Sequence, residues 1–319
     1  MRRLMLLALA VLFAGGPARA EWPSKPVRII VPFAAGSTPD AVARVMAEGF
    51  QAEMPGSAFV VENKPGASGN LGTEAVAKAE PDGATMGLSI GGPLAINTLL
   101  FSNLKYDPAR EIAAVSQLVT QASILAVHKS VGVKTVGELV AALKAEPQKY
   151  TFGSIGVGSL SHLAMEAISQ KAGVKLVHLP MQGSPAAMTA LLRGDVQLAC
   201  LPSIAVSQHA GSGDIVILAV TTPERSPFLP QVPTLKESGI GVEADAWNGF
   251  IAPAGVAPDV VARMSAMTAK VLARPEVRAK LAAQQMVPVG STPAQFRALI
   301  DAEIARWAPV IRAAGIKIN

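Results

Sequence analysis

VRIIVPFAAGSTPDAVARVMAEGFQAEMPGSAFVV, residues 27–61, is the stretch that decides the fold class. Four of its first five residues are apolar and β-branched, which favours a buried strand. A loop of small residues and prolines, 32–39, comes next, and residues 40–50 favour a helix. Residues 59–61 are apolar again and favour a second strand. A strand, a helix and a strand in this order are typical of an α/β fold.

Strand and helix patterns keep alternating along the rest of the chain, which implies parallel sheets covered by helices. Thr135, with Glu138 three residues later, predicts a helix start with a capping box. Further strands are expected at 85–90, 123–127, 150–154, 175–178, 196–201, 215–220 and 247–252, and further helices at 70–78, from 135, and at 161–171, 184–192, 258–285 and 292–314.

The chain has 319 residues, which is long enough for two lobes, and no linker rich in Pro, Gly or Ser divides it in half. We therefore expect two α/β lobes joined by crossover strands near residues 114–122 and 219–253. Residues 21–118 and 222–319 are expected to form lobe one, and residues 119–221 to form lobe two.

The first twenty residues have the pattern of a secretory signal peptide. Arg2 and Arg3 precede an apolar run, 4–14, and Ala18-Arg19-Ala20 matches a cleavage box of small residues. The apolar run is too short to span a bilayer, which takes roughly 20 residues. We expect a mature exported chain that starts near Glu21 and, in a Gram-negative bacterium, resides in the periplasm.

Charge and composition exclude several functions. Removing residues 1–20 takes away three arginines and no acidic residue, so the formal net charge falls from +5 to +2 and nothing indicates nucleic acid. Cys200, the single cysteine, lies in an apolar run and is expected to be a buried small side chain. No two of the four histidines are four residues apart, so we expect no metal. Aromatic residues make up only 4% of the chain, which disfavours a sugar because sugars stack on aromatic rings. The histidines are His128, His162, His178 and His209.

Four loops rich in glycine and serine, 33–40, 65–70, 89–93 and 153–161, each follow a predicted strand. In open α/β sheets, ligands bind at the carboxyl ends of strands. Helix N-termini there offer free N–H groups and the positive end of the helix dipole, which suits an anion. The loops therefore predict a site for a small carboxylate. The alternative is that they are ordinary turns between strand and helix.

Two enzymatic chemistries find less support. A dinucleotide fingerprint that began at Gly156-Val-Gly158 would need its third glycine where Ser161 stands. A hydrolase needs Ser, His and Asp within reach of one another. Ser154, His162 and Asp40 could be nominated, but no spacing supports them. We therefore expect neither an enzyme nor a bound cofactor.

Several short segments, in order and together, make the chain similar to the tripartite tricarboxylate receptor family, also called Bug proteins. The resemblance covers nearly the whole mature chain. It implies a two-lobed periplasmic-binding-protein-like fold of type II, in which each lobe is a mixed sheet flanked by helices and the ligand cleft lies between the lobes. The segments are KPVRIIVPF (25–33), 36–44, VVENKPG (60–66), PDG (81–83), YDP (106–108), GSIGVGSLSHL (153–163), VPTLKESG (232–239) and WNGFIAPA (247–254).

The resemblance also implies which residues bind the ligand. Family members hold a carboxylate with the loop after the first strand and with the loop before the first long helix of lobe two. Carried over, the contacts from lobe one are Phe33, Gly36, Ser37 and Asp40. Those from lobe two are Ser154, Gly156, Gly158, Ser159 and His162. Residues expected to flank the cleft and tune specificity are Ala67, Ser68, Ser89, Gly183 and Ser184.

The chain departs from the family pattern at three places. Gly36-Ser37 stands where the family usually has Gly-Gly, and Gln197 replaces a typical aspartate. Met181-Gln-Gly-Ser184 stands where Tyr-Lys-Gly-Ser is common. Loss of that Tyr and Lys weakens the case for a dicarboxylate and favours a less polar or singly charged ligand.

The implied function is that of a monomeric extracytoplasmic receptor. It would capture a small carboxylate-type ligand by closing its lobes and deliver it to the membrane permease subunits of a tripartite tricarboxylate-type transporter. Two alternatives stay open at this point. One is a ligand-sensing subunit for a two-component kinase, and the other is an exported hydrolase. The sequence does not identify the ligand.

Overall fold

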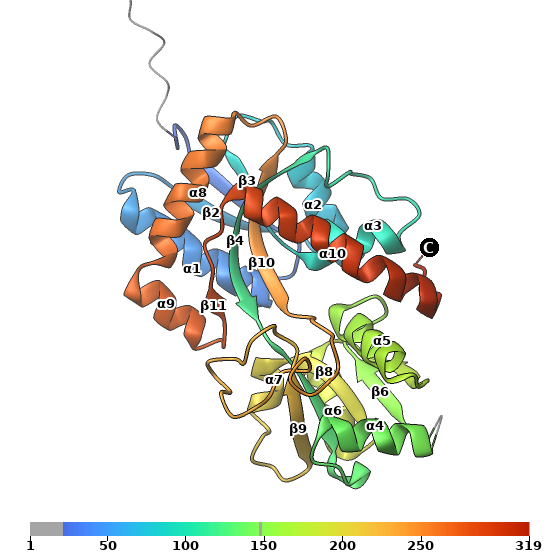
Figure 1. Cartoon of the computed structure of the whole chain (residues 1–319). Coiled ribbons are helices and arrows are strands. Elements are labelled where there is room, and N and C mark those ends of the chain that lie inside the picture. Colours follow the sequence, from blue (N-terminus) through green and yellow to red (C-terminus); the bar gives the residue numbers. More distant parts are fainter. Residues whose placement is uncertain (1–21, 147–148, 319) are drawn as a thin grey trace, which may run out of the picture.

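The fold consists of two mixed β-sheets, each covered by helices (Figure 1). The computed structural model describes residues 22–146 and 149–318. The first sheet has the strand order β11-β4-β10-β3-β1-β2, and the second has the order β7-β6-β8-β5-β9. The strands are β1 Val27–Val31, β2 Phe59–Asn63, β3 Thr85–Ile90, β4 Ile112–Gln121, β5 Ser123–His128, β6 Thr151–Ser154, β7 Val177–Pro180, β8 Leu198–Pro202, β9 Ile215–Val220, β10 Ala246–Pro253 and β11 Val287–Pro288.

The sheets are parallel only in part. β1 pairs in parallel with β2 and β3, and β6 pairs in parallel with β7 and β8, as the alternating pattern predicts. In contrast, β10 and β5 pair antiparallel with both of their neighbours. These are the strands by which the chain enters one sheet from the other. The mixed sheets implied by the family resemblance are therefore confirmed, and the expectation of parallel sheets throughout is wrong.

The two passages between the sheets differ in length. The first predicted crossover, near residues 114–122, is largely the strand β4, and Ala122 alone separates β4 from β5. The chain returns between Val220, the end of β9, and Ala246, the start of β10. The strand β4 of the first sheet extends three residues, 119–121, into the range predicted for lobe two, and the lobe limits stay a prediction.

The helices begin and end largely where the sequence predicts. The run 258–285 instead forms two helices, because Pro275 cannot continue the first of them. The capping box predicted at Thr135 forms only in part. Its hydroxyl accepts from the Glu138 N–H (3.1 Å), but the Glu138 carboxylate accepts from the Lys134 N–H, one residue before the cap. The helices are α1 Thr38–Glu53, α2 Asn70–Ala77, α3 Asn97–Leu100, α4 Val136–Ala145, α5 Leu160–Ala172, α6 Ser184–Arg193, α7 Ser203–Ser207, α8 Pro258–Leu272, α9 Pro275–Ala282 and α10 Pro293–Ala314.

Helix α10 links the two lobes. It packs along the first sheet, and its C-terminal end lies beside α5 of the second lobe (Figure 1). A single buried cluster contains Trp307 and Ile311 from α10 together with Leu163 and Ile168 from α5. An apolar core therefore extends from one lobe into the other on this side of the molecule.

Three further expectations concern the predicted signal peptide, Cys200 and metal binding. The predicted signal peptide, residues 1–20, lies outside the described residues. None of the helices within 22–146 and 149–318 is long and apolar enough to cross a membrane. The same ranges hold no group of His, Cys, Asp and Glu that could bind a metal ion. Cys200 is fully buried, and burial raises the pKa of its thiol to about 12, so it is an apolar core residue as expected.

Candidate functional site

A cavity of about 470 Å³ lies between the two sheets and collects several of the predicted loops. Lobe one contributes the loop after β1, the turn after β3 and the start of β10, and lobe two contributes the loop after β6 and the start of α6. The predicted site residues that line it are Phe33, Ser68, Gly156, Gly158, Ser159 and Ser184.

Three helices begin at this cavity. Thr38 is the first residue of α1, Leu160 of α5 and Ser184 of α6, and all three residues line it. The first N–H groups of a helix have no intrahelical acceptor and lie at the positive end of the dipole. No side chain caps the N-terminus of α1 or of α6, since the Ser37 hydroxyl forms no capping hydrogen bond and Gly183 has no side chain. The cavity therefore presents backbone donors from both lobes, an arrangement that suits an anion.

Asp40 orders the loop after β1. Its carboxylate accepts hydrogen bonds from the Gly36 N–H (2.8 Å), Arg44 Nε (3.0 Å) and Asn63 Nδ2 (2.9 Å). Burial acts against the ionised form, but these hydrogen bonds outweigh it and lower the pKa of Asp40. Asp40 is 3% exposed and, like Gly36 and Ser37, does not line the cavity. Asp40 therefore fixes the position of the loop after β1 without lining the cavity itself.

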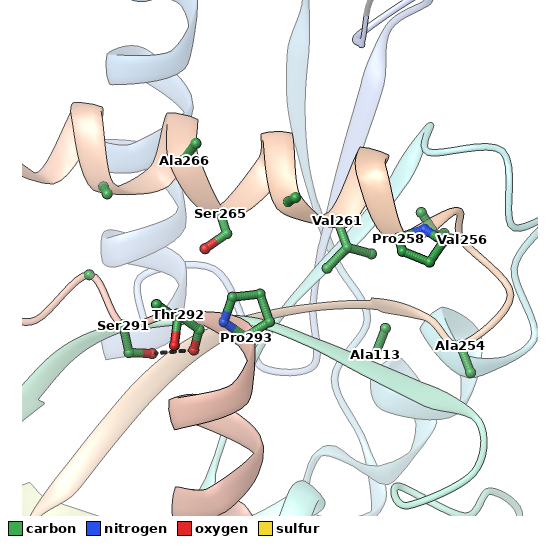
Figure 2. A pocket seen from close by; sticks show the side chains of 13 residues that line it. Ala113, Ala254, Val256, Pro258, Val261, Ser265, Ala266, Ser291, Thr292 and Pro293 are labelled. Carbon is green, nitrogen blue, oxygen red and sulfur yellow. Dashed lines mark hydrogen bonds between the residues drawn. The ribbon is translucent and has the colours of Figure 1, made fainter. Parts of the chain in front are cut away.

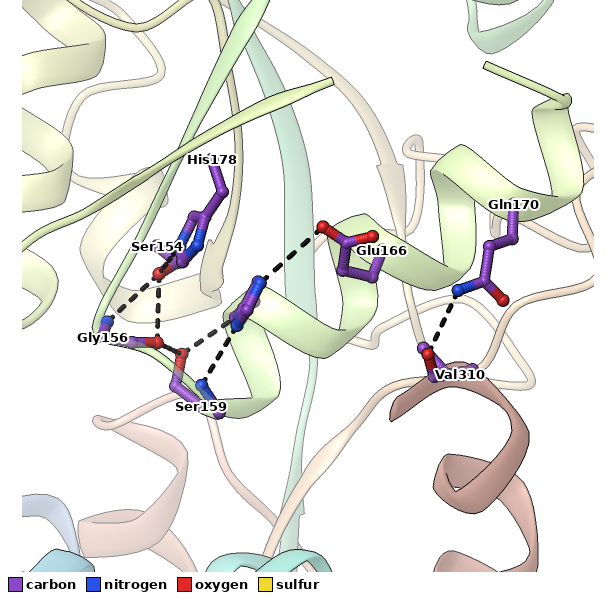
Figure 3. Close-up of polar contacts among 9 residues, drawn as sticks. Ser154, Gly156, Ser159, Glu166, Gln170, His178 and Val310 are labelled. Atoms are coloured by element: carbon purple, nitrogen blue, oxygen red, sulfur yellow. Dashed lines mark hydrogen bonds and ion pairs between the residues drawn. The ribbon is translucent and has the colours of Figure 1, made fainter. Parts of the chain in front are cut away.

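A network of side chains shapes the loop after β6 (Figure 3). Ser154 Oγ and His178 Nε2 share a hydrogen bond of 2.7 Å, and the same hydroxyl donates to the Gly156 carbonyl. Ser159 accepts from the His162 N–H (3.2 Å) and donates to the Gly156 carbonyl (2.7 Å). The Gly158 N–H donates to His162 Nδ1 (3.0 Å). Ser154 and His162 thus fix the loop without lining the cavity.

His178, given no role in the site by sequence reasoning, belongs to this network. Its ring stacks against Phe152, at a centroid distance of 4.8 Å, and against His162, at 3.8 Å, and these two rings also contact each other at 6.0 Å. Burial and the neighbouring His162 lower the pKa of His178 to about 4, against the opposite effect of Glu166. The fold therefore holds this imidazole neutral.

Acidification is expected to destabilise the protein through His178. The unfolded chain binds a proton near the ordinary pKa of 6.5, whereas the folded chain binds it only near pH 4. The unfolded state thus takes up the proton first, so stability is full above pH 6.5 and falls between pH 6.5 and 4. Because the side chain is half-buried and partly screened by solvent, we expect a total loss of about 1 kcal/mol.

Urea unfolding at several pH values between 7.5 and 4 tests this. His178→Gln removes the titrating group but keeps a hydrogen-bonding side chain near Ser154, and its stability should fall less over the same window. The carboxylates titrate in both proteins, so the difference between the two pH dependences of stability isolates the contribution of His178. If the free energy of unfolding of both proteins changed equally with pH, the assignment of this effect to His178 would be contradicted.

The remaining predicted residues lie around the cavity. Ser68, which lines it, and Ala67, which does not, both have left-handed backbone conformations, with φ of 55° and 48°. Ser89 is 1% exposed and shares a hydrogen bond of 3.3 Å with Thr73. The residues that follow it, 90–92, line the cavity instead.

Sequence reasoning missed the part of the lining that comes from the C-terminal third of the chain. Asp245, Trp247 and Asn248, at the start of β10, and Glu303, in α10, all line the cavity. Trp247 and Asn248 belong to a segment that matches the family pattern, and this is the only sequence signal that pointed toward them. Nothing local singles out Asp245 or Glu303.

Glu303 is a buried carboxylate, 3% exposed. It accepts hydrogen bonds from Arg306 Nη1 (2.5 Å) and Trp307 Nε1 (2.9 Å). Burial raises the pKa of Glu303 and the charge of Asp245 adds to this, although the hydrogen bond from Trp307 and the charge of Arg306 act in the opposite direction. The charged side chains in the described part of the lining, Asp245 and Glu303, are both acidic.

A second cavity, of about 650 Å³, lies on lobe one between α8 and the start of α10 (Figure 2). Its lining is mostly small and apolar, with Val261 and Ala266 from α8 and Ala113 from β4. Helix α10 begins with Pro293, which has no N–H, and the Thr292 hydroxyl accepts from the third residue of the helix. The two helices that begin at this cavity, α8 at Pro258 and α10 at Pro293, both start with a residue that has no N–H, whereas the three helices at the first cavity start with residues that have one, so the first is the better candidate for an anion.

The fold and the cavity define a class of protein. Two α/β lobes with a ligand-sized cavity between them are typical of periplasmic solute-binding receptors. The chain belongs to the tripartite tricarboxylate transporter family receptors, whose sequence profile matches residues 42–316. This is a family of receptors rather than enzymes.

Individual relatives support the assignment. BugT of Bordetella pertussis is 33% identical over 100% of this chain and 99% of its own length. A solved R. palustris protein with adipate is 32% identical, covers 93% of this chain and 99% of its own, and superposes with a TM-score of 0.80. MatC from Rhodopseudomonas palustris with bound malate is 28% identical, covers 91% of this chain and 100% of its own, and has a TM-score of 0.75.

The predicted hydrolase residues are not assembled. Asp40 lies in α1 of lobe one, where its carboxylate binds Arg44 and Asn63. Ser154 bonds to His178 rather than to His162. Ser154, His162 and Asp40 therefore do not form a hydrolase triad.

Proposed function

We propose that this protein is a periplasmic receptor that captures a small carboxylate in the cavity between its lobes. The observation that carries the proposal is the meeting of three helix N-termini, at Thr38, Leu160 and Ser184, in one cavity between two lobes. The adipate and malate named for two relatives are consistent with such a ligand.

The proposed contacts follow from where the predicted residues lie. Those that line the cavity would touch the ligand, and Phe33 would cover its apolar part. Asp40, Ser154 and His162 would act through the loops that they hold. Closure would turn one lobe, residues 119–221, against the other about the two connections between the sheets.

Removing one backbone N–H donor from the cavity tests whether these donors bind a carboxylate. Proline is tolerated at the first position of a helix, and Ser159 before Leu160 already has the extended backbone, with φ of −67° and ψ of 158°, that proline requires. Leu160→Pro should therefore leave α5 folded but remove one N–H from the cavity. Leu160→Ala is the matched control, since it shortens the same side chain and keeps the N–H.

The readout is thermal shift and calorimetry against mono-, di- and tricarboxylates. A carboxylate at 100 times its Kd should stabilise the parent protein by about 2.7 kcal/mol. We expect Leu160→Pro to weaken that binding about tenfold, the effect of losing one hydrogen bond to a charged group, and Leu160→Ala to weaken it less. Absence of any carboxylate ligand, or equal affinity of both variants, would contradict the proposal.

We further propose that the loaded receptor delivers its ligand to a tripartite tricarboxylate-type permease. The family to which the chain belongs supports this partner. Deleting the gene should abolish uptake of the ligand found in the binding screen. Unchanged uptake together with altered ligand-dependent transcription would favour a sensor instead.

A further inference from the structure

One contact joins the tip of the loop after β6, in lobe two, to two side chains of lobe one. Gly158 is buried, although Val157 beside it is 49% exposed. A Cβ at Gly158 would come within 2.5 Å of Leu100 Cδ1 and 3.1 Å of Ile318 Cδ1. These two methyl groups therefore fill the space beside the glycine, and a larger residue there would have to displace them.

The lobe-one side of this contact is held in place by backbone interactions. Ile318 follows the end of α10, and its N–H donates to the Leu100 carbonyl at the end of α3 (3.1 Å). A β-bridge also pairs Ile318 with Phe101. Leu100 is 4% exposed, and Ile318 packs against the apolar cluster to which Leu100 belongs. The C-terminal tail and the end of α3 thus form one apolar surface.

The lobe-two side of the contact is also fixed before the lobes meet. Gly158 has a left-handed backbone, with φ of 73°, which glycine adopts without strain. Its N–H donates to His162 Nδ1 (3.0 Å), and the next residue, Ser159, donates its own N–H to the Gly156 carbonyl (3.2 Å). The loop therefore needs little further ordering when it meets the other lobe.

Gly158, Leu100 and Ile318 all line the cavity between the lobes. Since the glycine follows a strand of the second sheet and the two side chains belong to lobe one, turning the lobes apart breaks this contact. A contact that exists only in the closed state stabilises that state. It also slows the release of a bound molecule, because release requires the lobes to open.

We propose that Leu100 and Ile318 form a latch that holds Gly158 in the closed receptor and thereby slows the release of the bound molecule. This inference rests on the proposed function, since it presupposes lobe closure around a carboxylate. It assigns the control of release to side chains of α3 and of the C-terminal tail, and it leaves the chemical class of the bound molecule as proposed above.

Release rates provide the first test. Trp247 lines the cavity, so its fluorescence reports binding of acetate, pentanoate, succinate, L-malate, adipate or citrate in a stopped-flow instrument. For the compound that binds most tightly, Ile318→Ala should speed release by about fivefold or more, because it removes apolar surface that is buried only on closure. The association rate should change by less than about twofold.

Val289→Ala is the control for this variant, since Val289 belongs to lobe one, is 44% exposed and does not line the cavity. Release from the Ile318→Ala variant at the parent rate would overturn the inference while leaving the proposed function intact. Binding of none of the six compounds to the parent protein would instead remove the proposed function, and this inference with it.

A double-mutant cycle separates the latch from direct contact with the bound carboxylate. Gly158→Ala places a Cβ against Leu100 Cδ1 and should weaken binding about tenfold. Adding Leu100→Ala removes that methyl group and should restore about threefold or more of the lost affinity, whereas two independent contacts with the carboxylate would weaken binding additively.

Gly156→Ala is the matched control for the cycle. Gly156 lies in the same loop and also has a positive φ, of 135°, but the nearest atom to an added Cβ is the Met181 carbonyl oxygen of lobe two at 4.0 Å. Leu100→Ala should therefore restore no affinity to Gly156→Ala. Circular dichroism and the Tm establish that each variant is folded. If Leu100→Ala restored binding to neither glycine variant, or to both equally, the latch would be contradicted.

Discussion

Replacing Trp307 with alanine should lower the free energy of unfolding by about 3–5 kcal/mol. Trp307 is 1% exposed and is the largest of the fully buried side chains in the described part of the chain. It belongs to the cluster that joins α10 of lobe one with Leu163 and Ile168 of α5. Because parts of both lobes enclose the ring, neither can collapse freely into the space that it leaves, and the cavity term should be large.

The indole also has a polar role, which a second variant isolates. Its Nε1 donates to Glu303 Oε2 (2.9 Å), so Trp307→Phe keeps an aromatic ring but deprives a buried carboxylate of one donor. We expect that variant to lose about 1–3 kcal/mol. Urea unfolding of both variants measures the effects. Leu71→Ala is the control, since Leu71 is 54% exposed and should change stability by less than about 0.5 kcal/mol.

The order of the three losses of stability tests whether the Trp307 ring is buried between the lobes. Losses in the order alanine, then phenylalanine, then the Leu71 control would agree with a buried ring that serves both lobes. A small effect of Trp307→Ala would mean that α10 and α5 separate easily in solution. In that case the two connections between the sheets alone would hold the lobes together.

The sequence predicted the fold well because the strands that build the sheets are short, apolar and buried. Residues 27–31, 85–90 and 215–220 became β1, β3 and β9 with the expected limits. The strand β4, IAAVSQLVTQ, was predicted only as a crossover near residues 114–122, because Ser, Gln and Thr interrupt its apolar residues. Of its polar residues, Gln121, the last residue of the strand, lines the cavity.

The candidate site could be predicted only in part, for a physical reason. Loops rich in glycine and serine can be recognised in the sequence, and 33–40 and 153–161 do reach the cavity. Whether a polar side chain in such a loop points to the ligand or back to the loop depends on its own hydrogen bonds. Asp40 and His162 accept backbone N–H groups and so point away from the cavity.

Long-range contacts explain what was missed. Glu303 reaches the cavity because α10 crosses from the first sheet to the second lobe, a path that no local pattern encodes. Asp245 lies at the end of an irregular connection, just before β10 begins. A charged residue in such a place is usually interpreted as part of an exposed loop, and only the fold brings it to the cavity.

Replacing Gly72 with alanine should destabilise the protein by about 1–3 kcal/mol and also weaken ligand binding. Gly72 lies in α2, where that helix packs on β1. A Cβ at this position would come within 2.5 Å of Pro32 Cα and 2.8 Å of the Lys64 carbonyl oxygen. Both are backbone atoms, so the strain cannot be relieved by turning a side chain. Pro32 leads directly into the loop that carries Phe33, so displacing it should also move the lobe-one part of the cavity.

Gly137→Ala is the matched control for this change. Gly137 is also helical and lies in the first turn of α4, but it is exposed, and the nearest atom to an added Cβ is Thr135 Oγ1 at 4.0 Å. Alanine favours helix over glycine, so this variant should be stabilised by up to about 1 kcal/mol. Urea unfolding and calorimetry on both variants give the comparison. Suppose that Gly72→Ala is as stable as Gly137→Ala and binds the ligand normally. That result would contradict the close contact between α2 and the loop after β1, and it would mean that the loop does not depend on α2 for its position.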